Sequence, residues 1–277
     1  MTFTMLGLSQ EAFASPLAAT APSLGQAGSF SVLAALSAAG TGVTTTIQGD
    51  LGLSINTESS RTGEWNVGGD EYFGPSTKAA NASNNALGAY NNLASQGTNG
   101  PFGDTAPLPG VWTSDSSETF TGTLTLNGDY DDVWVFQIPS SLTFSGNVVM
   151  GGDAQACHVF WAVGIDATIA SGSNFIGTLI AHRDITLVSG ATVSGRIISL
   201  DSSITVDGNT ISMPPCASAP VAETTAVPTV SGLPTSGGAP LRSEVFPLGL
   251  AILFGGLSIV VAVLIVRAMR RNYRQKQ

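Results

Sequence analysis

The stretch "DITLVSGATVSGRIISLDSSITVDGNTIS", from Asp184 to Ser212, decides the fold because it repeats itself. Its segments Gly190-Ala-Thr-Val and Gly208-Asn-Thr-Ile lie 18 residues apart. A period of about 18 to 19 residues with two or three short strands per repeat is typical of a β-solenoid. Each coil rises by one strand spacing, about 4.8 Å, so equivalent side chains stack into columns.

Short runs with a threonine between two apolar residues extend this pattern from Glu118 to Ile211. Strand side chains alternate between the two faces, so the apolar neighbours should fill the core and the threonine should point outward. Threonine offers a hydroxyl and a methyl group on a stiff side chain. The predicted outward column consists of Thr125, Thr143, Thr168, Thr186 and Thr205.

Residues 76–97, "STKAANASNNALGAYNNLASQG", carry their apolar side chains at helical spacing instead. Ser76 is a candidate N-cap and Gly97 a candidate stop. The sequence therefore predicts one amphipathic helix lying along the solenoid, and residues 28–70 are expected to add further strands.

Charge is scarce and unevenly distributed. Charged residues make up 10% of the chain, and five of the ten basic residues lie in the last eleven positions. Residues 1–244 hold five basic and nineteen acidic residues, a balance of −14. An acidic body repels phosphate backbones, so the composition excludes nucleic acid as a partner.

The C-terminal part predicts display at the cell surface. Residues 245–266 are 22 uncharged residues, long enough for a transmembrane helix, and the basic residues 267–277 should remain cytoplasmic. Residues 217–244, rich in Pro, Thr and Ser, are expected to form an extended stalk. Residues 1–23 contain the cleavage-like triplet Ala12-Phe13-Ala14 without a basic region, and we interpret them as the remainder of a longer signal peptide.

The stalk contains a stretch that resembles the cell-wall sorting signal of Gram-positive-type bacteria. In that family a sortase, a transpeptidase with a cysteine nucleophile, cuts before the glycine of the motif and joins the chain to peptidoglycan. The cut would fall here between Ser236 and Gly237, and Ser236 stands where the family usually has threonine. The alternative is a simple membrane anchor. The motif residues are Leu233, Pro234, Thr235, Ser236 and Gly237.

Two cysteines, Cys157 and Cys216, are too few for a zinc site of the usual kind. In an exported chain they could form a disulfide, which would stabilise the fold by roughly 4 kcal/mol, and the alternative is two unrelated thiols. His158 and His182 have no metal-ligand spacing. The sequence shows no cluster of catalytic residues, phosphate loop or nucleophile elbow, so we expect neither an enzyme nor a cofactor.

Residues 24–216 resemble the β-solenoid ice-binding proteins of bacteria and microbial eukaryotes. The resemblance rests on "LGQAGSFSVLA" (24–34), "TTIQGDLGLS" (45–54), the Ala-rich helix, "VWVFQI" (133–138), "ACHVFWAVG" (156–164), "FIGTLIAHRDITLVSGATVSGRIIS" (175–199) and Cys216. It implies an all-β fold, a right-handed parallel solenoid of triangular section with one helix alongside, and adsorption to ice through a flat face.

A recurring family motif is Thr, then Ala or Gly, then any residue, then Thr or Asn. It corresponds here to Ser171-Gly-Ser-Asn174 and Ser189-Gly-Ala-Thr192, with a distorted copy that ends at Thr210. Serine or aspartate replaces the first threonine, which loses methyl groups. The resemblance therefore marks a second candidate face, with Ser171, Asn174, Ser189, Thr192 and Thr210.

Two functions are consistent with these features. The first is a surface-anchored protein that binds ice through one of the two faces. The second is a non-catalytic structural or adhesive module that binds a glycan or another cell. Carboxylates such as Asp166, Asp184 and Asp207 flank the threonine column, and because they hold their own hydration shells they should disturb an ice-like array of water.

Overall fold

The computed structural model describes residues 18–75, 77–103, 105–213 and 216. Four predicted segments lie outside these residues: most of the leader (1–23), the stalk, the sorting motif and the transmembrane span at 245–266. Of the leader, only residues 18–23 are described. Within the described residues, no helix is both long and apolar enough to span a membrane.

The described residues form nineteen strands that pair in parallel and wind into a solenoid with three faces. We name the faces by their strands, in stacking order, and four long strands contribute to two faces each. Face 1 holds the first parts of β10 (Glu118–Gly128) and β12 (Leu142–Gly152), then β14 (Ala167–Ile169), β16 (Ile185–Leu187), β18 (Ile204–Val206), β2 (Ala38–Gly40) and β5 (Arg61–Thr62).

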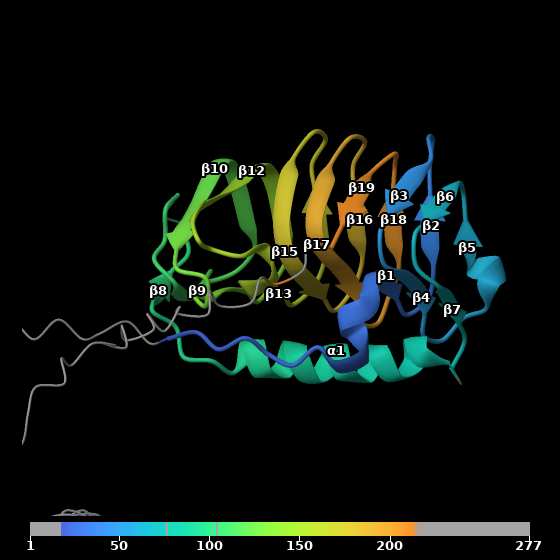
Figure 1. The fold of residues 1–277 in the computed structure, drawn as a ribbon, viewed down its shortest axis with the longest axis horizontal. Coiled ribbons are helices and arrows are strands. Elements are labelled where there is room, and N and C mark those ends of the chain that lie inside the picture. The colour runs from blue at the N-terminus through green and yellow to red at the C-terminus, as the bar shows by residue number, and fades with distance from the viewer. Residues whose placement is uncertain (1–17, 76, 104, 214–215, 217–277) are drawn as a thin grey trace, which may run out of the picture. The chain divides into compact units, whose positions relative to one another are not determined.

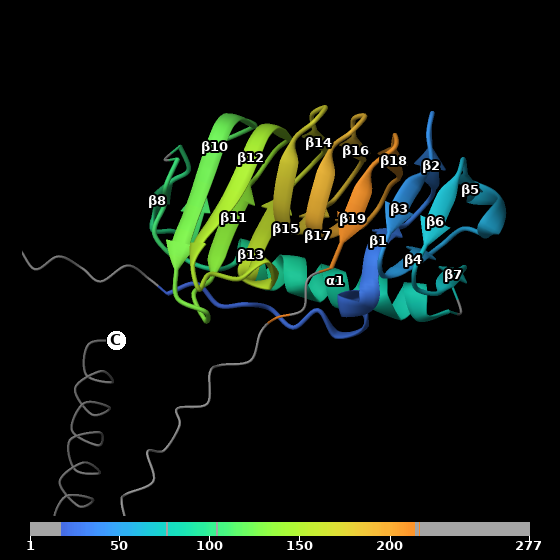
Figure 2. The same ribbon diagram turned by 45° about the horizontal axis from the view of Figure 1, so that its top comes forward.

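Face 2 begins with the second parts of β10 and β12. It continues with the first parts of β15 (Asn174–Ala181) and β17 (Thr192–Ser199), then β19 (Thr210–Ser212), β3 (Thr45–Ile47) and β6 (Trp65–Val67). Figure 2 shows the strands of these two open faces following one another along the stack.

The third face is covered by the helix α1 (Lys78–Ala94). Besides the second parts of β15 and β17, this covered face holds β8 (Gly100–Pro101), β9 (Gly110–Thr113), β11 (Trp134–Ile138), β13 (Val159–Val163), β1 (Phe30–Ala34), β4 (Asp50–Leu53) and β7 (Glu71–Phe73). Three short 3₁₀ segments complete the described elements: η1 (Gly25–Ser29), η2 (Glu58–Ser60) and η3 (Ala156–His158).

The chain does not build the stack in sequence order. It enters at β1, coils outward to β7 and returns along the covered face as α1, which Figure 1 shows running from near β7 to near β9. From β8 the chain coils back along the stack until its last coil meets the first one. There β17 pairs with β1, β18 with β2, and β19 with β3. We call this contact between distant segments the seam.

Alternation along the strands fills the core as predicted, and aromatic rings dominate one end of it. The rings of Phe136 and Trp161 stack at 4.1 Å between centroids, and Phe144 and Phe175 meet edge to face at 5.2 Å. Such aromatic pairs add to the free energy gained by burial alone. A second apolar layer lies under the helix, where alanines of α1 allow it to approach the covered face closely.

The helix is shorter than predicted at both ends. It begins at Lys78, with Thr77 as N-cap because the Thr77 hydroxyl accepts a hydrogen bond from the Ala79 N–H at 3.3 Å. It ends at Ala94, with Ser95 as C-cap. The predicted cap Ser76 and stop Gly97 are therefore wrong by one and by two residues.

An ion pair fixes the start of the helix. Lys78 Nζ lies 2.7 Å from Asp50 Oδ2, and it also lies over the rings of Phe30 and Tyr72. Burial alone would raise the pKa of Asp50, but hydrogen bonds from Lys78 and from the Asp70 N–H outweigh it and hold the pKa below its ordinary value.

Cys157 and Cys216 form a disulfide, with 5.7 Å between their Cα atoms, which confirms that prediction. The bond joins η3 to the residue that lies just beyond β19. Together with His158 these two sulfurs lie within 4.8 Å of one another, but sulfurs in a disulfide are not thiolates and cannot act as metal ligands of that kind.

Candidate functional site

Four of the five residues predicted for the first threonine column share one register on face 1. Thr143, Thr168, Thr186 and Thr205 pair in succession across β12, β14, β16 and β18. The column continues across the seam to Ala39 and then to Thr62. Parallel pairing in register thus stacks equivalent residues of face 1 into one column.

Thr125 was assigned to this column wrongly. It pairs with Val149 on face 2, and Thr119 takes its predicted place opposite Thr143. The pattern of a threonine between two apolar residues missed Thr119 because Glu118, not an apolar residue, precedes it on the core side. Burial raises the pKa of Glu118 at this position.

Charged side chains border face 1. Asp184 Oδ1 accepts hydrogen bonds from Ser202 Oγ at 2.5 Å and from the Ser203 N–H at 3.2 Å, beside Thr186. Arg183 Nε lies 3.9 Å from Asp166 Oδ1 beside Thr168, and Asp207 follows β18 on the opposite edge. Threonines on this face therefore stand among ionic groups that hold their own hydration water.

Face 2 carries a column that no alanine interrupts, whereas Ala39 interrupts the column of face 1. At seven successive levels the residue facing outward is a threonine or an asparagine, and all of them are exposed or half-buried. Two adjacent members are hydrogen-bonded, because Thr192 Oγ1 donates to Asn174 Oδ1 at 3.2 Å. The face 2 column consists of Thr123, Asn147, Asn174, Thr192, Thr210, Thr46 and Asn66.

Three of the five residues of the second candidate set predicted from the sequence lie together on face 2. Asn174, Thr192 and Thr210 are consecutive members of the face 2 column. Ser171 and Ser189 instead lie at the corner between faces 1 and 2, where Ser171 Oγ donates to the Ser189 carbonyl at 2.7 Å. These two serines hold neighbouring coils together at the edge of the face.

A glycine follows Ser171, Ser189 and the equivalent residue Asp207 at this corner, for a conformational reason. Gly172, Gly190 and Gly208 have φ of +67°, +74° and +59°, a region that residues with a Cβ adopt at a cost. The turn that they permit brings the chain from face 1 to face 2 in a few residues. The glycine of the family motif is therefore required by the corner.

Beside the column, face 2 has a second row of outward side chains without charge. It includes Thr125, Val149, Ser194 and Ser212, whereas Ile176, which pairs with Ser194, is largely buried. Within the described residues, the strand segments that form face 2 contain no Asp, Glu, Lys, Arg or His. The strands of face 2 thus combine hydroxyl, amide and methyl groups. Asp166 and Asp184 border face 1, and Asp207 lies at the corner that the two faces share.

Sequence reasoning missed four members of the column: Thr123, Asn147, Thr46 and Asn66. Thr46 lies within residues 28–70, where the sequence predicts further strands, but its pairing with Thr210 joins residues 164 positions apart. No local period could reveal this neighbour. Thr123 and Asn147 lie in the second halves of the two strands that cross both open faces, and the threonine pattern assigned each of these strands to face 1 alone.

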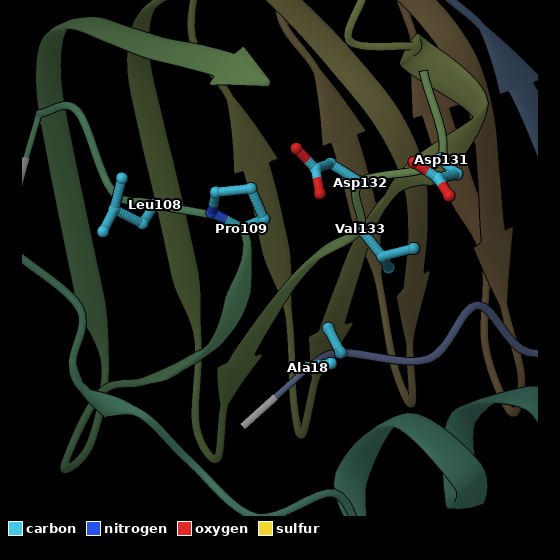
Figure 3. Close-up of a pocket in the computed structure, with 7 residues that line it drawn as sticks. Ala18, Leu108, Pro109, Asp131, Asp132 and Val133 are labelled. Atoms are coloured by element: carbon cyan, nitrogen blue, oxygen red, sulfur yellow. The ribbon is translucent and has the colours of Figure 1, made fainter. Parts of the chain in front are cut away.

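One cavity of about 450 Å³ lies away from the face 2 column, beneath the first described residues of the chain. In Figure 3 it is bordered by Ala18, by Leu108 and Pro109, and by Asp131 to Val133. Asp132 Oδ2 accepts a hydrogen bond from the Asp129 N–H of its own turn at 2.7 Å. The lining residues offer no nucleophile and base pair.

Known proteins resemble this chain over the solenoid. The family model called Ice-binding-like matches residues 32–212. An ice-binding protein of Nostoc sp. (strain HG1) is 34% identical over 187 residues, which cover 64% of this chain and 68% of that protein. Ice-binding protein K3-B1 of Typhula ishikariensis is 29% identical over 206 residues, covering 62% and 83%.

Solved structures agree. An ice-binding protein from an Antarctic biological consortium superposes with a TM-score of 0.68 at 31% identity, over 76% of this chain and 97% of that one. The ice-binding protein of the Antarctic ascomycete Antarctomyces psychrotrophicus gives 0.64 at 28% identity, over 71% and 100%. The resemblance inferred from the sequence is confirmed, and the chain belongs to the Ice-binding-like family.

Proposed function

We propose that this protein binds ice and that it does so through face 2. The observation that carries the proposal is the face 2 column, seven levels of threonine or asparagine on strands that carry no charged side chain. Hydroxyl and amide groups can hold water in a fixed array, and methyl groups shape the water between them. Because paired strands fix the spacing, many weak contacts add without a further cost of ordering.

The family relationship supports ice as the partner. The relatives and the solved structures compared above are named as ice-binding proteins. Within this proposal the solenoid is right-handed and triangular in section, so that face 2 forms one whole side of it. Function is then adsorption to the crystal without catalysis, and a threonine-rich surface without catalytic groups supports this.

Face 2 is favoured over face 1 by its surroundings. A carboxylate binds its own water molecules strongly and is costly to desolvate, so it should disturb an ice-like layer. Asp166 and Asp184 stand beside the threonines of face 1, and strands of face 2 contain no such group. Of the residues first predicted for face 1, only Thr125 belongs to the proposed site, because it lies in the second row of face 2.

The decisive experiment is a matched pair of substitutions. Thr192→Tyr places a bulky ring in the middle of the face 2 column, and Thr186→Tyr does the same on face 1 of the same coil. We expect wild type to show thermal hysteresis and inhibition of ice recrystallisation, Thr192→Tyr to lose most of both, and Thr186→Tyr to retain them. Melting temperatures of the three proteins provide the control for folding.

Each other outcome has a definite meaning. A folded wild-type protein without either activity would refute ice binding and favour the adhesive module that binds a glycan or another cell. Loss of activity in Thr186→Tyr alone would move the site to face 1.

We further propose that the domain is displayed on the cell surface. The apolar residues 245–266 and the basic residues 267–277 support a membrane anchor, and Leu233–Gly237 supports cleavage by a sortase and linkage to peptidoglycan. Deleting residues 233–237 should release the protein from the cell-wall fraction. Wall linkage that persists after the deletion would contradict the sorting role and leave the membrane anchor as the explanation.

A further inference from the structure

Asn209 is a buried polar residue at the corner between faces 1 and 2, directly before Thr210 of the face 2 column. Its side chain is almost inaccessible, with 1% of its surface exposed. The carboxamide nitrogen donates to the carbonyls of Val188 at 2.9 Å and Ala191 at 3.0 Å. The carboxamide oxygen accepts from the Asp207 N–H at 2.7 Å, so each polar atom of the side chain is used.

The backbone of Asn209 bonds in the opposite direction, across the seam. Its N–H donates to the hydroxyl of Thr45 at 3.2 Å, and its carbonyl accepts from the Thr46 N–H at 2.9 Å. Thr45 is fully buried. Asn209 therefore connects the preceding coil on one side with a coil 164 residues away in sequence on the other.

These partners lie next to column residues. Ala191 precedes Thr192, Asn209 precedes Thr210, and Thr45 precedes Thr46. The bonds of Asn209 thus fix the backbone beside three consecutive members of the face 2 column. Elsewhere on the stack, neighbouring coils are also joined covalently through the chain, but at the seam only non-covalent contacts set their relative position.

Pairing of strands at the seam is sparse on face 2. β19 and β3 share two registered pairs, Thr210 with Thr46 and Ile211 with Ile47, whereas β18 and β2 share three on face 1. A small rotation at this point would separate the column into a block of five residues and a block of two. The backbone of Asn209 opposes this rotation through its bonds to the Thr45 hydroxyl and the Thr46 N–H, and the Asn209 side chain holds that backbone against the preceding coil. Such alignment matters for a surface that must match a crystal.

We propose that Asn209, together with the Thr45 hydroxyl, is a positioning residue that keeps the face 2 column continuous across the seam. It touches no ice itself. The inference rests on the proposed function of face 2 and deepens it, because it assigns the alignment of Thr192, Thr210 and Thr46 to a residue that is hidden from the surface.

The test substitution is Asn209→Ala in the full chain. Alanine fits this position, because Ala191 occupies the equivalent place one coil earlier. The change removes the side-chain hydrogen bonds to Val188, Ala191 and Asp207. The backbone bonds of residue 209 to Thr45 and Thr46 then start from a corner that no side chain holds in place. We expect thermal hysteresis to fall by about half or more, because two separated blocks adsorb more weakly than one continuous array. Thr45→Val, which removes the hydroxyl acceptor at nearly constant volume, should act in the same direction.

The matched control is Ser203→Ala. It removes the hydrogen bond between Ser37 Oγ and Ser203 Oγ, 2.8 Å long, which crosses the same seam at the edge of face 1. All three variants should lower the melting temperature, but only Asn209→Ala and Thr45→Val should reduce ice activity. Binding of fluorescently labelled protein to a single ice crystal should show a weaker or altered pattern of crystal planes for these two variants only.

The outcomes separate this inference from the proposed function. If wild type lacks ice activity, or if Thr192→Tyr retains it, the assignment of face 2 fails. If Thr192→Tyr abolishes activity while Asn209→Ala and Thr45→Val behave like Ser203→Ala, face 2 stands and the positioning role of Asn209 is refuted.

Discussion

Face 1 and face 2 are built on the same coils, yet they differ in what surrounds their threonines. On face 1 five threonines stack from β10 to β18, and Ala39 interrupts the column before Thr62. Aspartates and an arginine lie at the borders of this face. On face 2 a threonine or an asparagine stands at each of seven levels, on strand segments that contain no charged residue.

The difference teaches that a threonine column is not by itself evidence of a binding surface. Threonine is favoured on half-exposed strands for its β-propensity, so a solenoid with low charge produces such columns on any open face. What distinguishes face 2 is the absence of carboxylates from its strands and the longer run of hydroxyl and amide groups. The four predictions that follow test this comparison, from the largest expected effect to the smallest.

Loss of the disulfide should lower the stability of the fold and increase local opening of β19 on face 2 more than that of β18 on face 1. Replacing Cys157 and Cys216 by alanine opens a crosslink between residues 59 positions apart, and roughly 4 kcal/mol of stability should be lost. Because Cys216 lies just beyond β19, we expect the amides of Thr210–Ser212 to exchange with solvent faster than those of Ile204–Val206 on face 1 of the same coil. Denaturant unfolding and hydrogen exchange measure the two effects, and equal acceleration on both faces would contradict the difference.

A carboxylate introduced into the face 2 column should weaken adsorption of the protein to ice. Thr210→Asp puts a charge in the face 2 column, and Thr205→Asp puts one on face 1 of the same coil, where Asp184 and Asp207 already lie nearby. We expect Thr210→Asp to weaken adsorption to ice about tenfold, equivalent to ~1.4 kcal/mol, and Thr205→Asp to change it little. Partition of each protein into growing ice measures the effect, and similar losses in both variants would show that charge does not distinguish the faces.

An ion pair beside the covered face should make the stability of the fold depend on pH in acid, whereas face 2 has no such group. The pKa of Asp50 is lower in the folded protein than in the unfolded chain, so its ion pair with Lys78 stabilises the fold fully above the unfolded value of about 3.9. This contribution is lost as the pH falls through the lower folded value. Asp50→Asn should therefore reduce stability near neutral pH and flatten the acid limb of the curve of unfolding free energy against pH; an unchanged slope would show that Asp50 is not responsible.

Ice binding itself should not depend on pH while the protein stays folded. The strands of face 2 carry no titratable side chain among the described residues. We expect thermal hysteresis to be constant from neutral pH down to the point at which circular dichroism shows unfolding. If face 1 bound ice instead, protonation of its bordering carboxylates would increase activity in acid, and such a rise would refute the assignment to face 2.

Much of the architecture follows from the sequence alone. The period of 18 to 19 residues sets one coil per repeat, and the alternation of apolar residues selects the core side of each strand, because both depend on local geometry. The helix along the stack and the disulfide between Cys157 and Cys216 were likewise predicted from residue pattern and from the expectation of export. Boundaries of the helix were less accurate, since Thr77 and Ser95 cap it in place of the predicted residues.

Tertiary structure alone decided which residues share a face. Thr119 and Thr125 both point outward from β10, six residues apart on a strand that crosses both open faces, so the in-and-out pattern cannot tell which of them pairs with Thr143. Thr46 and Asn66 join the face 2 column only because the chain returns along α1 and closes the seam against its own beginning. A repeat encodes the spacing between successive coils, but the pairing of strands far apart in sequence depends on the packing of the whole stack.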